Sequence, residues 1–599
     1  MANEKLDISG VETLPIQADG RIQPIESFAR NALKTLSGKS NLGDLSAAEW
    51  LMKSLFLPQE AVEIPVIFIG DQGVRRALHL PQRKGHLYRL DELNLAENMK
   101  DLPELLQKKA QKKVLTAQEK GLLDVFEKTA LDTQILRSFT FDAAFYNGEA
   151  VENYTKLLPA MQDLEARVRA IIKTKGTDPS QYTEEEQRLV MTAASMTVIR
   201  EGGEINTLFK VIPNSLDTDN QGWIAPWEIY TRGGGSPENG AFVDAWTKLR
   251  KDYVAGDASA FAASLHDLKA LYAPFLEKDG LGAKLEIEAL YMKLIPFGWA
   301  FGLYLASLLC ALCAVLFKEN RGAKYANILF KICFYTAVTV LVLAITARCY
   351  LLGRPPVGTL YESVLFASLI VGVGGALFDH MVGKHLYRLL AAFLGLFLLA
   401  LSFFALPDQH GLNVLQAVLN TQFWLATHVL CVTIGYGLCL LAAALAHVNL
   451  AQQAFAKGNR LSVGLSEIRL SAGFALLFMS VGTALGGIWA DQSWGRFWGW
   501  DPKENGALLI VLWLIWLLHG LISKDLKPLA FIFGVAVTGI FVALSWFGVN
   551  LLSIGLHSYG FIDGVAQGLG LYILLQCVIL ALLAHKIVRK NKNQQEIFG

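Results

Sequence analysis

The chain has 599 residues, a formal net charge of +1, a hydrophobic fraction of 53% and only 18% charged residues. This composition, with a mean hydropathy of +0.36, excludes an ordinary soluble protein. Most charges fall within residues 1–290, and the remainder is a series of apolar runs with short polar loops. We therefore expect at least two domains.

The first predicted domain, residues 1–290, carries patterns that favour a mainly helical fold with some strand. Ser46 and Glu49 have the spacing of a capping box, which starts a helix. Residues 64–69 are predicted to form a strand, and charged helical patterns fill about 98–130 and 155–205. No pattern in this domain indicates catalysis.

One segment of this domain is close to a calcium-binding loop. The first, third, sixth and twelfth loop positions are matched by Asp217, Asp219, Gly222 and Glu228. Pro213 spoils the incoming helix and Pro226 interrupts the loop, so the flanking helices of an EF-hand are compromised. We interpret the segment as a surface turn.

Nine apolar runs follow, each long enough to cross a bilayer as a helix, which takes roughly 18 residues. They lie near 293–317, 325–352, 361–383, 386–406, 425–447, 467–489, 507–523, 528–554 and 565–587. Residues 291–590 are therefore predicted to form a polytopic α-helical membrane domain with about nine transmembrane helices, followed by a tail at 591–599.

Basic residues in the loops predict the orientation of these spans. They gather at alternate ends of the spans, at Lys318, Arg321 and Lys324; Lys384 and Arg388; Lys457, Arg460 and Arg469; Lys524 and Lys527; and Lys586, Arg589, Lys590 and Lys592. The opposite loops, 407–424 and 555–564, contain no Lys or Arg. By the positive-inside rule the basic ends and the tail are cytoplasmic, and the first domain is external.

An external domain needs an export signal, and residues 1–30 contain no apolar signal region. Either the first span translocates the domain as a long amino-terminal tail, or the native protein begins upstream with further spans. All seven cysteines lie at or after Cys310, so the first domain cannot depend on disulfides. Cys310 and Cys313 have redox-motif spacing, but their place in an apolar run favours a packing role.

The most informative stretch runs from Trp494 to Glu504 and holds three indoles, two carboxylates and two cations between two apolar runs. Indoles are large, rigid and amphipathic, so several at a membrane boundary can form an apolar platform with polar edges. A single tryptophan there is typical of an interfacial belt. The cluster of Trp494, Trp498 and Trp500, followed by Asp501, instead favours a platform for a flat, apolar ligand.

This stretch resembles the tryptophan-rich "WWD" signature of a haem-handling membrane family of cytochrome c maturation, which includes CcsA (also called ResC), CcmC and CcmF. Residues 548–560 resemble the CcsA segment that carries the second external histidine, and residues 353–363 resemble the loop before an early CcsA span. The resemblance covers roughly residues 290–590. Residues 15–30 are more weakly similar to the external region of fused CcsB–CcsA proteins.

Two histidines flank the signature, and both fall on its predicted side of the membrane. The resemblance implies that His428 and His557 are the external axial ligands of a haem iron, with the indoles covering the porphyrin. Candidates to order these ligands or to meet the haem propionates are Arg496, Asp501 and Lys503.

His519 lies inside the span after the signature and matches the intramembrane histidine of the family. The resemblance implies that it holds haem on its way outward, and a simple hydrogen bond to a neighbouring helix is the alternative. The second histidine of this inner site has no clear equivalent in the chain. A separate CcsB (ResB)-like subunit, or a missing upstream segment, would supply it.

The resemblance implies a haem exporter and cytochrome c haem lyase (holocytochrome c synthase) of the CcsA type. It would be a multi-pass protein of the bacterial inner membrane, with its large domain and haem platform on the periplasmic side. Haem b would be the transported substrate, to be joined to the Cys-x-x-Cys-His segment of an apocytochrome c whose thiols a thioredoxin-like protein keeps reduced. No residue is identified as a catalytic acid or base for this step.

Three other functions are weighed against this one. Delivery of haem to a chaperone, as by CcmC, is disfavoured by the large first domain and by the sequence around His557. A quinol-oxidising b-type cytochrome usually places paired histidines across the bilayer, whereas here the pair shares one face. A solute transporter leaves the tryptophan loop without an explanation.

Overall fold

The computed structural model describes residues 6–93, 102–111, 113, 115–142, 144–146, 151–204, 206–214, 222–231, 236–317, 321–406, 412, 422–455, 463–549 and 565–598. The chain divides into two compact units, Met1–Lys293 and Leu294–Gly599.

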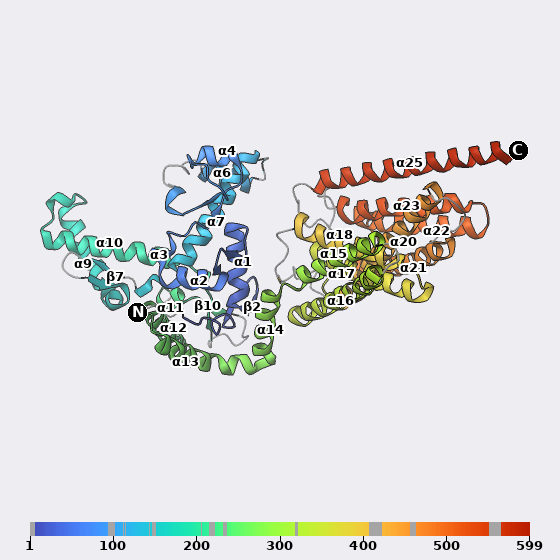
Figure 1. Ribbon diagram of the computed structural model, residues 1–599. Coiled ribbons are helices and arrows are strands. Elements are labelled where there is room, and N and C mark those ends of the chain that lie inside the picture. The colour runs from blue at the N-terminus through green and yellow to red at the C-terminus, as the bar shows by residue number, and fades with distance from the viewer. Residues whose placement is uncertain are drawn as a thin grey trace. The chain divides into compact units, whose positions relative to one another are not determined.

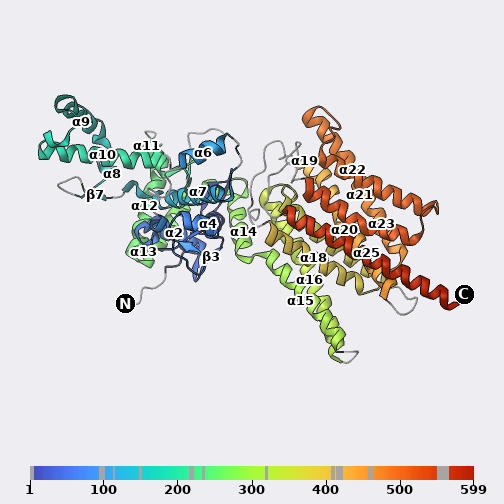
Figure 2. The ribbon, with the colours of Figure 1, turned by 90° about the horizontal axis from the view of Figure 1, so that it is seen from above.

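The first unit combines helices with short antiparallel hairpins (Figures 1 and 2). Its strands pair as β1 Pro15–Ala18 with β2 Arg21–Pro24, β3 Asn41–Leu42 with β4 Leu45–Ser46, β5 Ile67–Phe68 with β6 Leu87–Tyr88, β7 Ala144–Tyr146 with β8 Val151–Asn153, and β9 Ile212–Pro213 with β10 Trp223–Ile224. Its α-helices are α1 Ile25–Ser37, α2 Ala47–Phe56, α3 Pro58–Ala61, α4 Gln72–Ala77, α6 Leu102–Ala110, α7 Ala117–Arg137, α8 Tyr154–Leu157, α9 Met161–Lys175, α10 Glu184–Glu204, α11 Pro226–Thr231, α12 Pro237–Ala255, α13 Ala258–Glu277 and α14 Leu281–Leu294.

Local sequence explains several of these elements. The predicted capping box is confirmed, because Ser46 Oγ accepts from the Glu49 amide and Glu49 Oε2 accepts from the Ser46 amide. The predicted strand at 64–69 shortens to β5, since Pro65 has no amide hydrogen to donate. The second charged helical pattern is divided between α9 and α10, and Gly176, with φ of 79°, ends the first of them.

The core of this unit is aromatic and surrounds Trp246, which is fully buried. The rings of Phe139 and Phe209 lie 5.6 and 5.7 Å from it. Its indole N–H donates to Tyr272 Oη over 3.0 Å, and that hydroxyl donates to the Val211 carbonyl over 2.6 Å. The indole N–H of Trp246 and the hydroxyl of Tyr272 are therefore both hydrogen-bonded, which allows these two amphipathic rings to be buried.

The second unit is a helical bundle. Its segments are α15 Pro296–Leu316, α16 Arg321–Leu352, α17 Leu360–Val382, α18 Leu386–Ala405, α19 Gln422–Trp424, the π-helix η8 Leu425–Val429, α20 Leu430–Phe455, α21 Leu465–Trp494, α22 Pro502–Ile522, α23 Pro528–Ala543, the π-helix η9 Leu544–Gly548 and α25 Val565–Phe598. Among the described residues, nine helical segments are long and apolar enough to cross a membrane. The predicted polytopic helical fold is therefore confirmed.

Helix α20 is the centre of this bundle, and it packs against α17, α18, α21, α23 and α25. Small residues allow the close approach. Gly435 faces the Met479 side chain of α21, and Gly437 faces Ile370 of α17, where an added methyl group would come within 3.0 Å of the neighbour. Figure 2 shows α25, in red, running along the bundle as one long helix.

Candidate functional site

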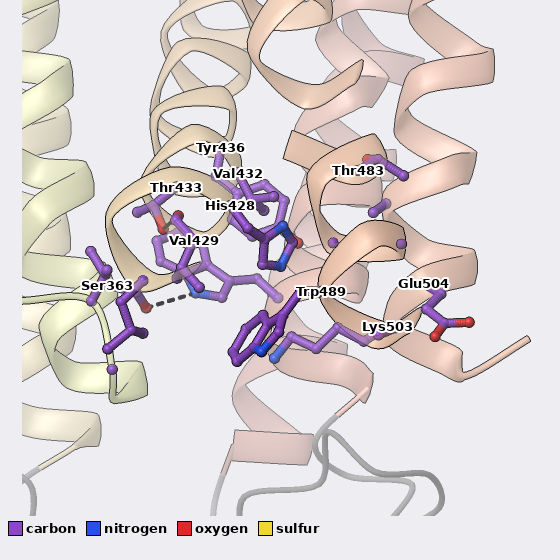
Figure 3. A pocket seen from close by; sticks show the side chains of 18 of the residues that line it. Ser363, His428, Val429, Val432, Thr433, Tyr436, Thr483, Trp489, Lys503 and Glu504 are labelled. Atoms are coloured by element: carbon purple, nitrogen blue, oxygen red, sulfur yellow. Dashed lines mark hydrogen bonds between the residues drawn. The ribbon is translucent and has the colours of Figure 1, made fainter. Parts of the chain in front are cut away.

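A cavity of about 160 Å³ lies where α20 begins and α21 ends (Figure 3). Segments far apart in the sequence form its wall: the turn at 357–360 with the start of α17, η8 with the first turns of α20, the last turns of α21, the tryptophan loop with the start of α22, and Trp546 of η9. Most of the wall is apolar or aromatic, which is typical of a site for an organic ligand.

His428 lies in this wall, within the π-helical turn η8. Its Nδ1 is 2.7 Å from the carbonyl oxygen of Gly482 on α21. Because a carbonyl only accepts, Nδ1 carries the proton and the lone pair of the imidazole is on Nε2. Metal-binding histidines commonly make this bond with the other ring nitrogen. The ring also lies 5.7 Å from that of Trp489, at 60° to it.

The three indoles of the signature do not share one position. Trp494 and Trp498 belong to the cavity wall. Trp500 is 71% exposed, is not part of that wall, and meets Trp498 edge-on at 6.2 Å. Its backbone has φ of 56°, which is unusual for a bulky residue and marks a sharp turn in the chain.

The carboxylates of the signature fold the loop itself. Asp501 is buried and its Oδ1 accepts from the Lys503 amide over 2.9 Å. Glu504 Oε2 accepts from the amides of Gly499 and Asp501 over 2.8 and 3.1 Å. Together they form the capping box that starts α22. Asp501 is not part of the cavity wall. We conclude that its role is to fix the conformation of the loop that carries Trp498 and Lys503.

The two cations of the signature differ in position. The Arg496 guanidinium lies over Gly499, where an added Cβ would be 1.1 Å from Nη1, and Arg496 is not part of the cavity wall. Lys503 belongs to that wall. In Figure 3 its side chain extends toward the Trp489 indole, whereas the Glu504 carboxylate points the other way.

A buried charge cluster supports the turn at 357–360. Glu362 accepts from Arg348 Nε over 2.9 Å and from Arg354 Nη1 over 2.8 Å, and all three residues are at most 5% exposed. Glu362 Oε2 also accepts from the Gly358 amide over 2.9 Å. The carboxylate thereby joins α16 to the turn that lines the cavity. Sequence reasoning missed this cluster, although an arginine within an apolar run is a signal of function.

Aromatic residues from three other helices were also missed. Trp489 of α21 is in the wall beside His428. Trp546 donates from Nε1 to Ser363 Oγ over 3.0 Å, and its ring lies 5.3 Å from Tyr436. No local pattern distinguishes these residues from interfacial or core aromatics.

The other two histidine predictions have different outcomes. His519 is exposed on α22, with Nδ1 3.0 Å from the carbonyl of Ile515, and it is not part of the cavity wall. It shares an exposed helix face with Leu512 and Trp516. His557 lies outside the described residues, as do Asp217 and Asp219 of the calcium-like segment. In the described part of the chain no group of three or more His, Cys, Asp or Glu residues is placed to hold a metal ion.

Comparison with known proteins shows which family the cavity-lining part of the chain matches. Residues 357–557 match the family described as cytochrome C assembly protein, and all residues of the cavity wall lie within that match. The chain is 30% identical over 318 residues to cytochrome c biogenesis protein CcsA of Parasynechococcus marenigrum (strain WH8102), a match covering 46% of this chain and 100% of that protein. A second CcsA, from Prochlorococcus marinus (strain MIT 9515), is 30% identical over 39% of this chain and 84% of its own length. Protein NrfI of Wolinella succinogenes is 30% identical over 46% of this chain and 31% of its own length.

Proposed function

This chain belongs to the CcsA family of cytochrome c biogenesis proteins, and from that premise we propose that it exports haem and attaches it to apocytochrome c as a holocytochrome c synthase. The protein is a multi-pass membrane protein that handles haem. Under this proposal it lies in the bacterial inner membrane, haem b is its substrate, and the cavity opens on the periplasmic side.

The observation that carries the proposal is the setting of His428. Its imidazole is held by the Gly482 carbonyl in the tautomer that presents a lone pair on Nε2, beside the indole of Trp489 and in a wall that also contains Trp494 and Trp498. A ring fixed in this way is suited to an axial bond to haem iron. We propose His557 as the second axial ligand, supplied by the segment after η9.

The attachment step adds the S–H of each cysteine in the Cys-x-x-Cys-His segment across one haem vinyl group. A carbon–sulfur bond forms, the thiol hydrogen passes to the other vinyl carbon, and no oxidant is needed. The haem supplies the reactivity, and the residues of the cavity bind, orient and shield it. Thiols must be reduced for this addition, so a thioredoxin-like reductant is a proposed partner.

An inner haem site is the second part of the proposal. His519 is exposed on a face of α22 that also exposes Leu512 and Trp516, each 55% accessible. A histidine that faces lipid is costly and tends to be functional. We propose that a CcsB-like membrane subunit covers this face and supplies a second histidine, so that haem enters there before it reaches the outer cavity.

The test is the optical spectrum of the purified full-length protein and its activity in cytochrome c maturation. Paired imidazoles are expected to give low-spin haem. His428→Ala and His557→Ala should each lose that spectrum and the covalent product, with partial recovery on addition of imidazole. His585→Ala, on the exposed surface of α25, is the matched control and should change neither.

Two results would contradict the assignment. One is an unchanged spectrum and full activity in both the His428 and the His557 variants. The other is rapid quinol oxidation by the wild-type protein, which would indicate a b-type cytochrome. Haem transfer to a chaperone without covalent attachment would instead indicate CcmC-like delivery.

A further inference from the structure

Trp489 has a buried N–H group without an acceptor. The residue is 9% exposed, lines the cavity, and its Nε1 is buried with no hydrogen-bond partner. A buried donor left unpaired costs about 1–3 kcal/mol, and most buried polar groups in native proteins are paired. An unpaired donor in a cavity wall therefore points to an acceptor on a ligand.

Other indoles of this bundle show that the arrangement is unusual. Trp424 stacks on Trp489 at 6.4 Å and donates its N–H to Gln492 Oε1 over 3.1 Å. Trp546 donates to Ser363 Oγ, and Trp513 donates to the Gly534 carbonyl, both over 3.0 Å. These three indoles thus have acceptors within the protein.

The charge next to this N–H is positive. Lys503 lines the same cavity and extends toward the Trp489 ring, and the Glu504 carboxylate points away from it (Figure 3). Glu504 Oε2 is already engaged by the amides of Gly499 and Asp501. The hydroxyls of Thr433 and Thr483 in the wall donate to carbonyls of their own helices. This end of the cavity therefore presents an N–H and an ammonium group, which suits an anionic acceptor.

We propose that Trp489 and Lys503 form a carboxylate site that binds a propionate of the haem. This inference rests on the proposed function, because the ring of Trp489 lies only 5.7 Å from that of His428, so that one ligand can reach both. An axial bond alone leaves the porphyrin free to turn about the iron–nitrogen axis. A carboxylate held at Trp489 and Lys503 fixes that rotation, and with it the edge at which the vinyl groups are presented to the cysteine thiols.

The experiment compares two probes on the full-length protein: haem, which carries two carboxylates, and its dimethyl ester, which carries none. Binding is followed by the Soret band in detergent, and low-spin character reports axial ligation. Trp489→Phe and Lys503→Gln should each weaken haem binding by about tenfold or more, as expected for loss of a hydrogen bond to a charged group. Both variants should keep the low-spin spectrum and bind the ester as the wild type does.

Trp424→Phe is the matched control, because it removes an indole N–H from the same aromatic stack but not from the cavity wall. It should leave the preference for haem over the ester unchanged. Equal losses of haem and ester in Trp489→Phe would show a packing role and overturn the carboxylate site, as would unchanged haem binding in both variants. In one outcome, His428→Ala abolishes low-spin binding, but Trp489→Phe and Lys503→Gln keep the wild-type ratio of haem affinity to ester affinity. In that case only the carboxylate site fails. If the wild type binds neither probe, the proposed function fails with it.

Discussion

The imidazole of His428 donates from Nδ1 to the backbone carbonyl of Gly482, 2.7 Å away on the adjacent helix. A carbonyl within α21 cannot rotate away as a side-chain acceptor can, so the helix itself sets the orientation of the ring. One turn further along, Gly486 leaves the space that the ring occupies, and a Cβ there would lie 2.6 Å from His428 Cε1. Position and tautomer are therefore fixed by the packing of η8 on α21.

Gly486→Ala is expected to displace the His428 ring without removing any ligand atom. We expect weaker haem binding, a shift from low-spin toward high-spin haem, and lower maturation activity. Gly473→Ala, on the same helix, is the control, because a Cβ there has no neighbour within 4 Å. Optical titration of both variants is the measurement. Equal spectra in the two would show that the space at Gly486 does not position the ligand.

The fold was largely predictable because the bilayer sets a strong rule for composition. Charged groups are costly in lipid, so apolar runs indicate the spans directly. Helix ends were less predictable: α20 continues to Phe455 and α21 to Trp494, past the predicted ends at 447 and 489. A helix need not stop where the apolar core stops, and hydropathy reports only the core.

The site was only partly predictable. His428 and the tryptophan loop are visible as a motif, but Trp489 and Trp546 reach the cavity through packing between helices distant in sequence. Two π-helical turns, η8 and η9, also change which face His428 and Trp546 present. Periodicity arguments assume a regular helix and cannot anticipate this rotation.

Glu362 is expected to be essential for stability. Glu362→Gln leaves Arg348 and Arg354 buried without their carboxylate, and removal of one partner from a buried ion pair costs about 3–5 kcal/mol. The expected result is a lower unfolding temperature in detergent and loss of haem binding as the turn at 357–360 loosens. Lys384→Gln, at a partly exposed pair with Glu467, should cost less than about 1 kcal/mol. A Glu362 variant as stable as this control would contradict the structural role.

The first unit should become less stable as pH rises, because of Asp132 in α7. Burial raises the pKa of this carboxyl to about 7 from an ordinary value of 3.8. Between these two pKa values Asp132 ionises only in the unfolded chain, so the free energy of unfolding falls as pH rises. Above pH 7 the total loss of free energy of unfolding reaches about 4 kcal/mol. Asp132→Asn should therefore stabilise α7 at pH 8, and the gain should shrink as pH approaches 4.

Hydrogen exchange of α7 in the full-length protein, measured across this pH range, checks the prediction. Asp124→Asn is the matched control, since Asp124 lies on the same helix with its side chain 59% exposed and paired with Lys128. It should leave the pH dependence of exchange unchanged. A pH slope that persists in Asp132→Asn would assign it to another group.

The topology predicted from the basic loops can be tested with reporters. A reporter fused after Lys592 should be cytoplasmic, because this position follows a basic end of a span. A reporter inserted in the 410–420 loop should be external, because that loop contains no Lys or Arg. Alkaline phosphatase and fluorescent-protein fusions distinguish the two sides. Both reporters on one side would overturn the orientation and, with it, the periplasmic placement of the cavity.

The last prediction concerns the exposed His519. One histidine gives one axial bond, so retention of haem at this position needs a second ligand. We expect a CcsB-like subunit to co-purify from the native membrane, and His519→Ala to lower the haem content of that complex without changing the spectrum of the outer site. Trp516→Leu changes a side chain on the same exposed face but leaves His519 in place. Co-purification of the subunit with this variant tests whether apolar contact on this face, rather than the histidine, holds the subunit. Full maturation by this chain in a host without such a subunit would refute the partner. Attention would then turn to His447, whose Nδ1 lies 2.8 Å from the Ala443 carbonyl and whose Nε2 is buried without a hydrogen-bond partner.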